Sequence, residues 1–172
     1  MKKVPNLKTE GYVPELSLRT SANEWWNIRE QLRRKNIVIY FVHDINCDKC
    51  RAHLKAFAQD YRDWGHINSE VVAVLPNSSA ELKVLAEALG LPFPLLSDAE
   101  GQALAAFTFD QLDQAGPPIV FVVDRLSTLY YHEIDDTADP FEEEKEVLTE
   151  VEFLENRTPD TGAFRINHER PA

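Results

Sequence analysis

The sequence of 172 residues predicts an α/β fold in which a central mixed β-sheet has helices on both faces. Residues 37–42 form an apolar run without polar alternation, which is typical of a strand buried on both faces. Residues 118–124 form a second such run, and segments with helical spacing separate the two. A chain of this length buries roughly 70% of its unfolded surface. We therefore expect one domain over residues 1–172, with a core at about 20–155, an irregular N-terminal segment and a polar C-terminal tail.

The segments on either side of strand 37–42 have different expected structures. Residues 1–20 look irregular or weakly extended, and Asn23 can then cap a helix. That helix would have three apolar residues on one face, namely Trp25, Ile28 and Leu32. From Cys47 to about Gly65 the apolar residues again have helical spacing. The expected inner stripe of this second helix is Cys50, Leu54, Phe57, Ala58 and Tyr61.

The middle of the chain continues the alternation. Residues 70–75 form the next expected strand, and Ser78 with Glu81 is a capping-box signature for a helix that ends at Gly90. Residues 91–98 then predict a short strand that leads into a small helix. The apolar residues of that helix are Leu104 and Phe107.

The last part of the chain predicts a hairpin and a helix. Residues 118–124 are a buried strand, and residues 128–132 are its expected partner. Asp139 before Pro140 is typical of a helix N-terminus. The inner side of this helix would consist of Val147, Leu148, Val151 and Leu154.

The charge of the chain limits its partners. A formal net charge of −11 argues against nucleic acid or an anionic membrane as the main partner, since both need a basic surface. Residues 133–155 contain eleven acidic residues and one base, Lys145. The simplest interpretation is a solvated acidic helix face, and a docking surface for a basic partner is the alternative. No apolar stretch near the N-terminus suits a signal peptide or a membrane span, so we expect a cytoplasmic location.

The only two cysteines, Cys47 and Cys50, stand directly after strand 37–42 with two residues between them. Two thiols at this spacing can close a small disulfide when the first one opens a helix. The free N–H groups and the dipole of the helix N-terminus would stabilise a thiolate at Cys47, while Cys50 would point toward the core. This pattern indicates redox chemistry. A chance pair of buried thiols and one half of a metal site are the alternatives.

The order of elements around this pair resembles the thioredoxin-like superfamily over about residues 20–155. The segment 91–107 is similar to the alkyl hydroperoxide reductase and thiol-specific antioxidant family, which is peroxiredoxin-like. The Pro118-x-x-Phe121-x-x-Asp124 pattern resembles thioredoxin-like reductases in which that proline is cis. The resemblance implies a thiol-dependent redox protein with a thioredoxin-like fold.

The chain departs from the peroxiredoxin pattern at the positions that bind peroxide. The family has a Pro-x-x-x-Thr-x-x-Cys loop, whereas Tyr40 and Asp44 stand at the corresponding positions before Cys47. Pro118 stands where the family usually has its arginine. An oxyanion without its donors loses on the order of 3 kcal/mol per missing contact. We therefore expect any peroxidase activity to be weak.

The motif also departs from ordinary thioredoxins. Asn46 replaces the tryptophan before the first cysteine, and Asp48 and Lys49 replace Gly-Pro between the cysteines. Lys49 and Arg51 favour a thiolate at the site, whereas Asp44 and Asp48 oppose one. The redox potential and the choice of partner therefore cannot be transferred from that family.

We interpret the chain as a thiol–disulfide oxidoreductase or thiol antioxidant that needs no tightly bound organic cofactor. Cys47 attacks a target disulfide and Cys50 resolves the mixed disulfide. Pro118, Asp48 and Lys49 are the expected substrate-binding residues. The expected partners are protein or small-molecule disulfides and thiols, together with a reducing electron donor, and neither nucleic acid nor a membrane.

Two other interpretations remain open. A non-catalytic thioredoxin-fold module would bind partners through the groove around Cys47 and Pro118 or through the acidic last helix. Alternatively, His43, Cys47, Cys50 and His53 form an array that could hold zinc or copper. We expect instead that His53 is an exposed helix residue and that His43 lies near the strand end, so no metal is assigned.

Overall fold

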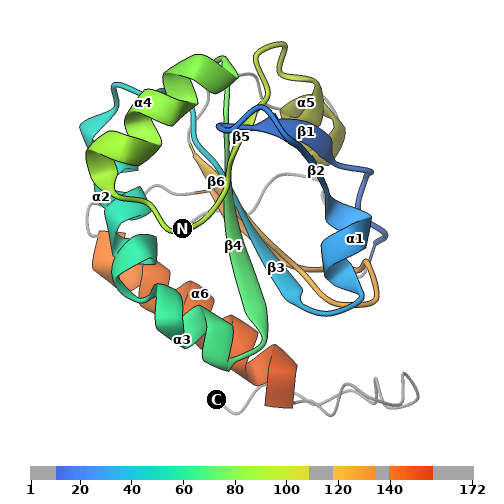
Figure 1. Ribbon diagram of the computed structural model, residues 1–172. Coiled ribbons are helices and arrows are strands. Elements are labelled where there is room, and N and C mark those ends of the chain that lie inside the picture. Colours follow the sequence, from blue (N-terminus) through green and yellow to red (C-terminus); the bar gives the residue numbers. More distant parts are fainter. Residues whose placement is uncertain (1–10, 109–117, 135–139, 157–172) are drawn as a thin grey trace.

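The computed structural model describes residues 11–108, 118–134 and 140–156, and these residues form a mixed β-sheet with helices on both faces (Figure 1). The seven strands are β1 (Ser17–Thr20), β2 (Trp25–Asn27), β3 (Asn36–Phe41), β4 (Ser69–Leu75), β5 (Leu95–Ser97), β6 (Ile119–Val123) and β7 (Leu129–Ile134). The helices are α1 (Ile28–Leu32), α2 (Asp48–Gln59), α3 (Tyr61–His66), α4 (Ser79–Leu89), α5 (Gln102–Thr108) and α6 (Pro140–Asn156). The expected fold class is therefore confirmed.

Strand β3 lies inside the sheet, whose order is β2-β1-β5-β4-β3-β6-β7. It pairs with β4 in parallel and with β6 in antiparallel orientation. All six of its residues are buried, as the unbroken apolar run predicts. The loop that carries the cysteines therefore follows the end of a central strand that is hydrogen-bonded on both sides.

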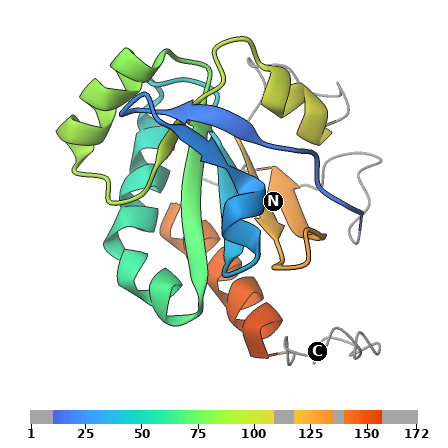
Figure 2. The ribbon, with the colours of Figure 1, turned by 45° about the vertical axis from the view of Figure 1, so that its right-hand side comes forward.

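Helices cover the two faces of the sheet unequally (Figures 1 and 2). Helices α2, α3, α4 and α6 pack on one face, where Val38 and Tyr40 of β3 contribute to the core. Helices α1 and α5 pack on the other face, with Ile37 and Ile39 of the same strand. Fully burying an aliphatic or aromatic side chain stabilises a fold by roughly 1.5–3 kcal/mol, so these two apolar layers hold the site's supporting elements in place.

The N-terminal region differs from its expected structure. Residues that were expected to begin a helix at Asn23 instead form the β1–β2 hairpin, and Asn23 has φ 61° in its turn. Trp25 is exposed and Trp26 is buried, which is the alternation of a strand. The helix begins only at Ile28, where the side chain of Asn27 accepts a hydrogen bond from the Arg29 backbone.

The helix expected from Cys47 to Gly65 is divided in two. Asp60 ends α2 with φ −100° and ψ 17°, and α3 begins at Tyr61. Helix α4 matches its prediction, since Ser78 and Glu81 form the full capping box and Gly90 adopts the left-handed conformation with φ 62°.

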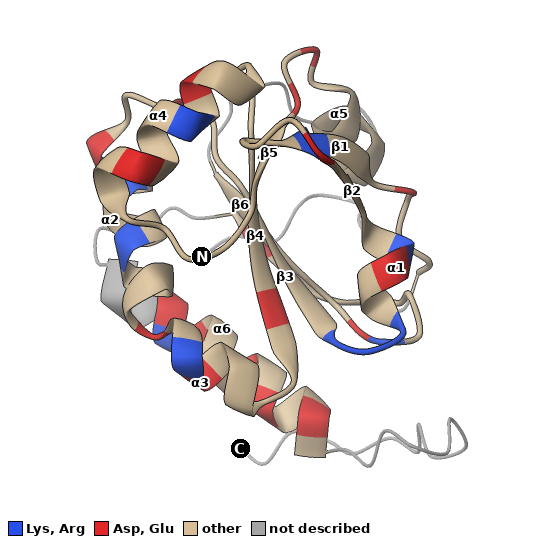
Figure 3. Cartoon of the chain, in the orientation of Figure 1, with Lys and Arg blue, Asp and Glu red and all other residues tan. Residues whose placement is uncertain are grey.

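Helix α6 carries much of the acidic character of the chain (Figure 3). Its residues Val147 and Val151 are buried as expected, and Glu146 and Glu152 are exposed. Glu146 and Glu152 fit the interpretation of a solvated acidic face, and Glu144 departs from it because it is buried. The expected cap Asp139 lies outside the described residues. No helix in the described ranges combines the length and the apolar character needed to cross a bilayer.

Candidate active site

The two cysteines lie where the chain passes from β3 into α2. Cys47 is the N-cap of α2, and the backbone N–H of Cys50 donates a hydrogen bond to Cys47 Sγ over 3.2 Å. Cys47 is half-buried, whereas Cys50 is completely buried on the inner face of the helix. This is the orientation that the helical stripe predicts.

Asp44 shapes the loop that presents Cys47. Its side chain accepts a hydrogen bond from the Asn46 backbone over 2.8 Å, and its carbonyl accepts one from the Cys47 backbone over 3.2 Å. Such an Asx turn fixes a short loop without a regular element. Asp44 therefore supports the position of Cys47 even though its charge opposes a thiolate.

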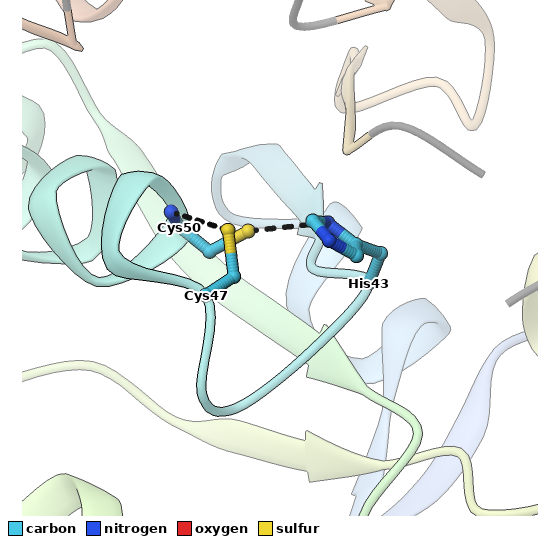
Figure 4. A group of neighbouring side chains, drawn as sticks. All are labelled: His43, Cys47 and Cys50. Atoms are coloured by element: carbon cyan, nitrogen blue, oxygen red, sulfur yellow. Dashed lines mark hydrogen bonds between the residues drawn. The ribbon is translucent and has the colours of Figure 1, made fainter. Parts of the chain in front are cut away.

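His43 is the residue that brings an imidazole to the cysteine pair (Figure 4). Its Nδ1 lies 3.3 Å from Cys50 Sγ. A ring nitrogen of His43 and both sulfur atoms all lie within 4.8 Å of one another. His43 itself is half-buried at the end of the β3 run, as the sequence predicts. The site is thus a compact group of two thiols and one imidazole.

Burial raises the pKa of the Cys50 thiol well above its ordinary value, and the nearby Cys47 sulfur raises it further. The backbones of His43 and Asp44 act in the opposite direction with a smaller effect. A protonated Cys50 can donate its S–H to Nδ1 of a neutral His43. In the reduced state Cys50 is therefore held as a thiol.

His53 does not join this group. It is buried on α2 and stacks on Tyr40, with ring centroids 5.7 Å apart. The expectation that His53 is an exposed helix residue is therefore wrong. The four-residue array is also reduced to three, because His53 takes part in the core beneath the helix.

The other residues expected at the site lie on two elements next to the cysteine loop. Asp48 is exposed and Lys49 is partly exposed in the first turn of α2. Pro118 is buried immediately before β6. Because Ile119 pairs with Phe41, the last residue of β3, Pro118 lies at the same end of the sheet as the start of the cysteine loop. Pro117 lies outside the described residues, so the structure does not test whether the bond before Pro118 is cis, as the resemblance implies, or trans.

The sequence interpretation did not use His43 in the thiol chemistry. The available signal was its position, four residues before Cys47 and directly after a buried strand. Only the fold shows that the loop returns Cys50 to this imidazole. Spacing alone gives no direction for a side chain in such a loop.

Comparisons with known proteins agree with this architecture. Residues 10–132 match the AhpC/TSA family. Peroxidoxin BcpB from Mycobacterium tuberculosis has a similar structure, with a TM-score of 0.78 and 16% identity over 87% of this chain and 99% of that chain. A PrxQ variant from Xylella fastidiosa gives a TM-score of 0.76 and 16% identity over 87% and 98% of the two chains. The mitochondrial 2-Cys peroxiredoxin from Plasmodium falciparum gives 0.73 and 14% over 86% and 94%.

These identities are low, so the likeness to solved structures concerns the fold. No curated protein sequence matches the chain.

Proposed function

The chain belongs to the AhpC/TSA family, and we propose from this that Cys47 and Cys50 work as a thiol–disulfide exchange pair. Membership places the protein among the thiol-dependent antioxidant oxidoreductases. The observation that carries the finer proposal is the asymmetry of the pair: one sulfur is half-buried at a helix N-terminus and the other is buried behind it.

In the first step Cys47 thiolate attacks a sulfur of the target disulfide. A bond forms between Cys47 Sγ and that sulfur, the target S–S bond breaks, and one thiolate leaves. The Cys50 N–H directed at Cys47 Sγ and the helix N-terminus favour negative charge on Cys47. Attack by Cys47 is also favoured by its partial exposure.

In the second step Cys50 attacks Cys47 Sγ and releases the second thiol of the target. The Cys50 proton must leave, and Nδ1 of His43 is positioned to accept it at 3.3 Å. The protein ends as the Cys47–Cys50 disulfide, and the target ends as two thiols. A reducing electron donor returns the pair to its dithiol form. Pro118, Asp48 and Lys49 are the proposed contact residues for substrate; Asp48 and Lys49 are accessible in the first turn of α2.

The test is to trap the intermediate. In Cys50→Ser the attacking thiol has no resolving partner, so a mixed disulfide with a reducible protein or with glutathione should accumulate. Cys47→Ser should trap almost none, because the remaining thiol is buried. Equal trapping by both variants contradicts the assigned roles. No trapping by either supports a non-catalytic interaction module instead.

A measurement of the Cys47–Cys50 reduction potential against glutathione refines the result. A low potential would identify a reductant, and a high potential would identify an oxidant. The proposed partners are protein or small-molecule disulfides and thiols. The proposed location is the cytoplasm, where cellular reductants return such a pair to its dithiol form.

Reduction of peroxide is a second candidate function because the family and the similar structures are peroxiredoxin-like. The loop argues for a low rate, since Asp44 occupies the place of the peroxide-binding threonine. An acidic side chain gives no donor to the departing oxygen. Disulfide exchange is therefore the better-supported reaction of this site.

A further inference from the structure

We propose that the reduced protein binds a zinc ion through Cys47 Sγ, Cys50 Sγ and His43 Nδ1. This site goes beyond the exchange reaction and does not depend on it. It would make the cysteine pair a metal site in one redox state and a disulfide in the other.

The three ligand groups lie close enough together for a single zinc ion to contact all of them. Tetrahedral zinc with Zn–S near 2.3 Å and Zn–N near 2.0 Å separates two sulfurs by about 3.8 Å and sulfur from nitrogen by about 3.5 Å. Here Cys50 Sγ and His43 Nδ1 are 3.3 Å apart, and a ring nitrogen of His43 and both sulfur atoms lie within 4.8 Å of one another. The observed separations are therefore of the size that zinc ligation needs.

The ligands are also held in place before any ion arrives. His43 follows the buried strand β3, and Cys47 and Cys50 belong to the first turn of α2. The Asp44 turn fixes the loop between them. A site built on a strand end and a helix start loses less conformational freedom on binding than one built from a mobile loop.

The donor set selects a thiophilic ion. Thiolate and imidazole ligands suit zinc and copper(I), whereas magnesium and calcium prefer oxygen. Two thiolates neutralise the charge of Zn²⁺, which favours zinc at a half-buried position. The described residues supply three ligands, so the fourth position of a tetrahedral ion is left for water or an external thiol.

Binding and oxidation exclude each other. Loading converts two thiols and Zn²⁺ into a zinc dithiolate and releases two protons. Oxidation consumes the zinc dithiolate, the substrate disulfide and two protons. It yields the Cys47–Cys50 disulfide, free Zn²⁺ and two thiols from the substrate. We therefore expect zinc to suppress exchange and a disulfide substrate to expel zinc.

The experiment uses the full chain, reduced and desalted without oxygen, and titrated with Zn²⁺ against a chromogenic chelator. Co²⁺ serves as the spectroscopic probe. We expect one equivalent of metal per chain, thiolate-to-cobalt absorption, and the visible bands of a four-coordinate ion. The disulfide form of the same protein should bind neither ion at the same concentration.

Variants identify the ligands. Removal of an outer-sphere partner already costs roughly 10- to 100-fold in metal affinity, so His43→Ala and Cys47→Ser should each lose at least about tenfold. The control is His66→Ala, which removes an exposed histidine on α3. Circular dichroism checks that each variant is folded, and His43→Asn replaces His43→Ala if the latter is not.

Three results would overturn the proposal. They are weak binding by fully reduced protein, equal binding by the disulfide form, and unchanged affinity after loss of His43. Mixed-disulfide trapping by metal-free Cys50→Ser is measured with excess chelator. Failure of zinc binding and failure of exchange can therefore be observed separately.

Discussion

The two thiols of the site have different surroundings although only two residues separate them. Cys47 is half-buried and receives the Cys50 N–H at the start of a helix. Cys50 is buried, and its sulfur faces His43. The difference comes from one turn of helix, which carries the second side chain from the surface into the core.

Alkylation should distinguish the two residues directly. We expect iodoacetamide to modify Cys47 at least about tenfold faster than Cys50 near neutral pH, because the reactive form is an accessible thiolate. Peptide mass spectrometry at several time points measures both rates in one sample. Faster modification of Cys50, or equal rates at both residues, contradicts the division of roles.

Peroxide turnover tests the loop before Cys47. Because Asp44 and Tyr40 replace the family's threonine and proline, we expect hydrogen peroxide consumption to be about 100-fold slower than that of a peroxiredoxin with the complete loop. The assay uses a thioredoxin-type donor, with Cys47→Ser as the blank. Rapid and saturable turnover by the natural sequence would show that other donors replace the missing ones.

At the scale of elements, helix α4 begins with a fully formed capping box. Ser78 accepts from the Glu81 backbone, and the Glu81 carboxylate accepts from the Ser78 backbone and hydroxyl. The Ser78 backbone and hydroxyl hold the pKa of Glu81 below its usual value. The cap satisfies N–H groups that the first turn leaves without helical partners.

Loss of this cap should lower stability without changing the site. We expect Ser78→Ala to reduce the free energy of unfolding by about 1 kcal/mol, as for other N-caps. Ser79→Ala, one residue later, is the control and should change it by less than about 0.5 kcal/mol. Urea denaturation of the two variants gives the comparison, and equal losses would show that the box contributes little.

The elements that the sequence predicts well are those with local signals. The α4 capping box and the buried strand β3 are both present, because caps and unbroken apolar runs depend on neighbouring residues. The β1–β2 hairpin was missed although it is local, because the spacing of Trp25, Ile28 and Leu32 also fits a helix. The pairing of Arg19 with Ser97, which joins β1 to β5, is distant in sequence and has no local signal.

The sequence likewise predicts some residues of the candidate site and not others. Helical spacing alone places Cys47 at the opening and Cys50 inside. The approach of His43 to Cys50 and the stacking of His53 on Tyr40 depend on loop and core geometry. The spacing of residues along the sequence predicts neither of these two side-chain contacts.

At the scale of the whole molecule, the part of the chain that the structure describes buries three acidic residues, namely Asp98, Asp124 and Glu144. Glu144 of α6 is buried, and neither of its carboxylate oxygens has a hydrogen-bond partner that meets normal geometry. Burial and the negative charges of Asp60 and Asp63 together raise the pKa of Glu144 to about 8, and the charge of Lys145 opposes them. Helix α6 packs on α2, so this carboxyl lies between elements that support the active site.

The stability of the protein should therefore depend on the protonation of Glu144. Its pKa is raised in the folded state, so its stabilising contribution is complete below about 4.5 and is lost as the pH rises toward about 8. Glu144→Gln stays neutral throughout, so it should unfold with a free energy on the order of 2 kcal/mol higher than the natural protein at pH 8.5. The two should differ far less at pH 4.5.

Denaturation by urea at several pH values between 4.5 and 8.5 measures this difference. Glu152→Gln removes the same charge from an exposed position on α6, so it controls for the general effect of net charge. That control should follow the natural protein at every pH, because a solvated carboxylate has little influence on folding. Parallel pH profiles for Glu144→Gln and the natural protein would mean that water reaches the Glu144 carboxylate. The packing of α6 on α2 would then be independent of its protonation.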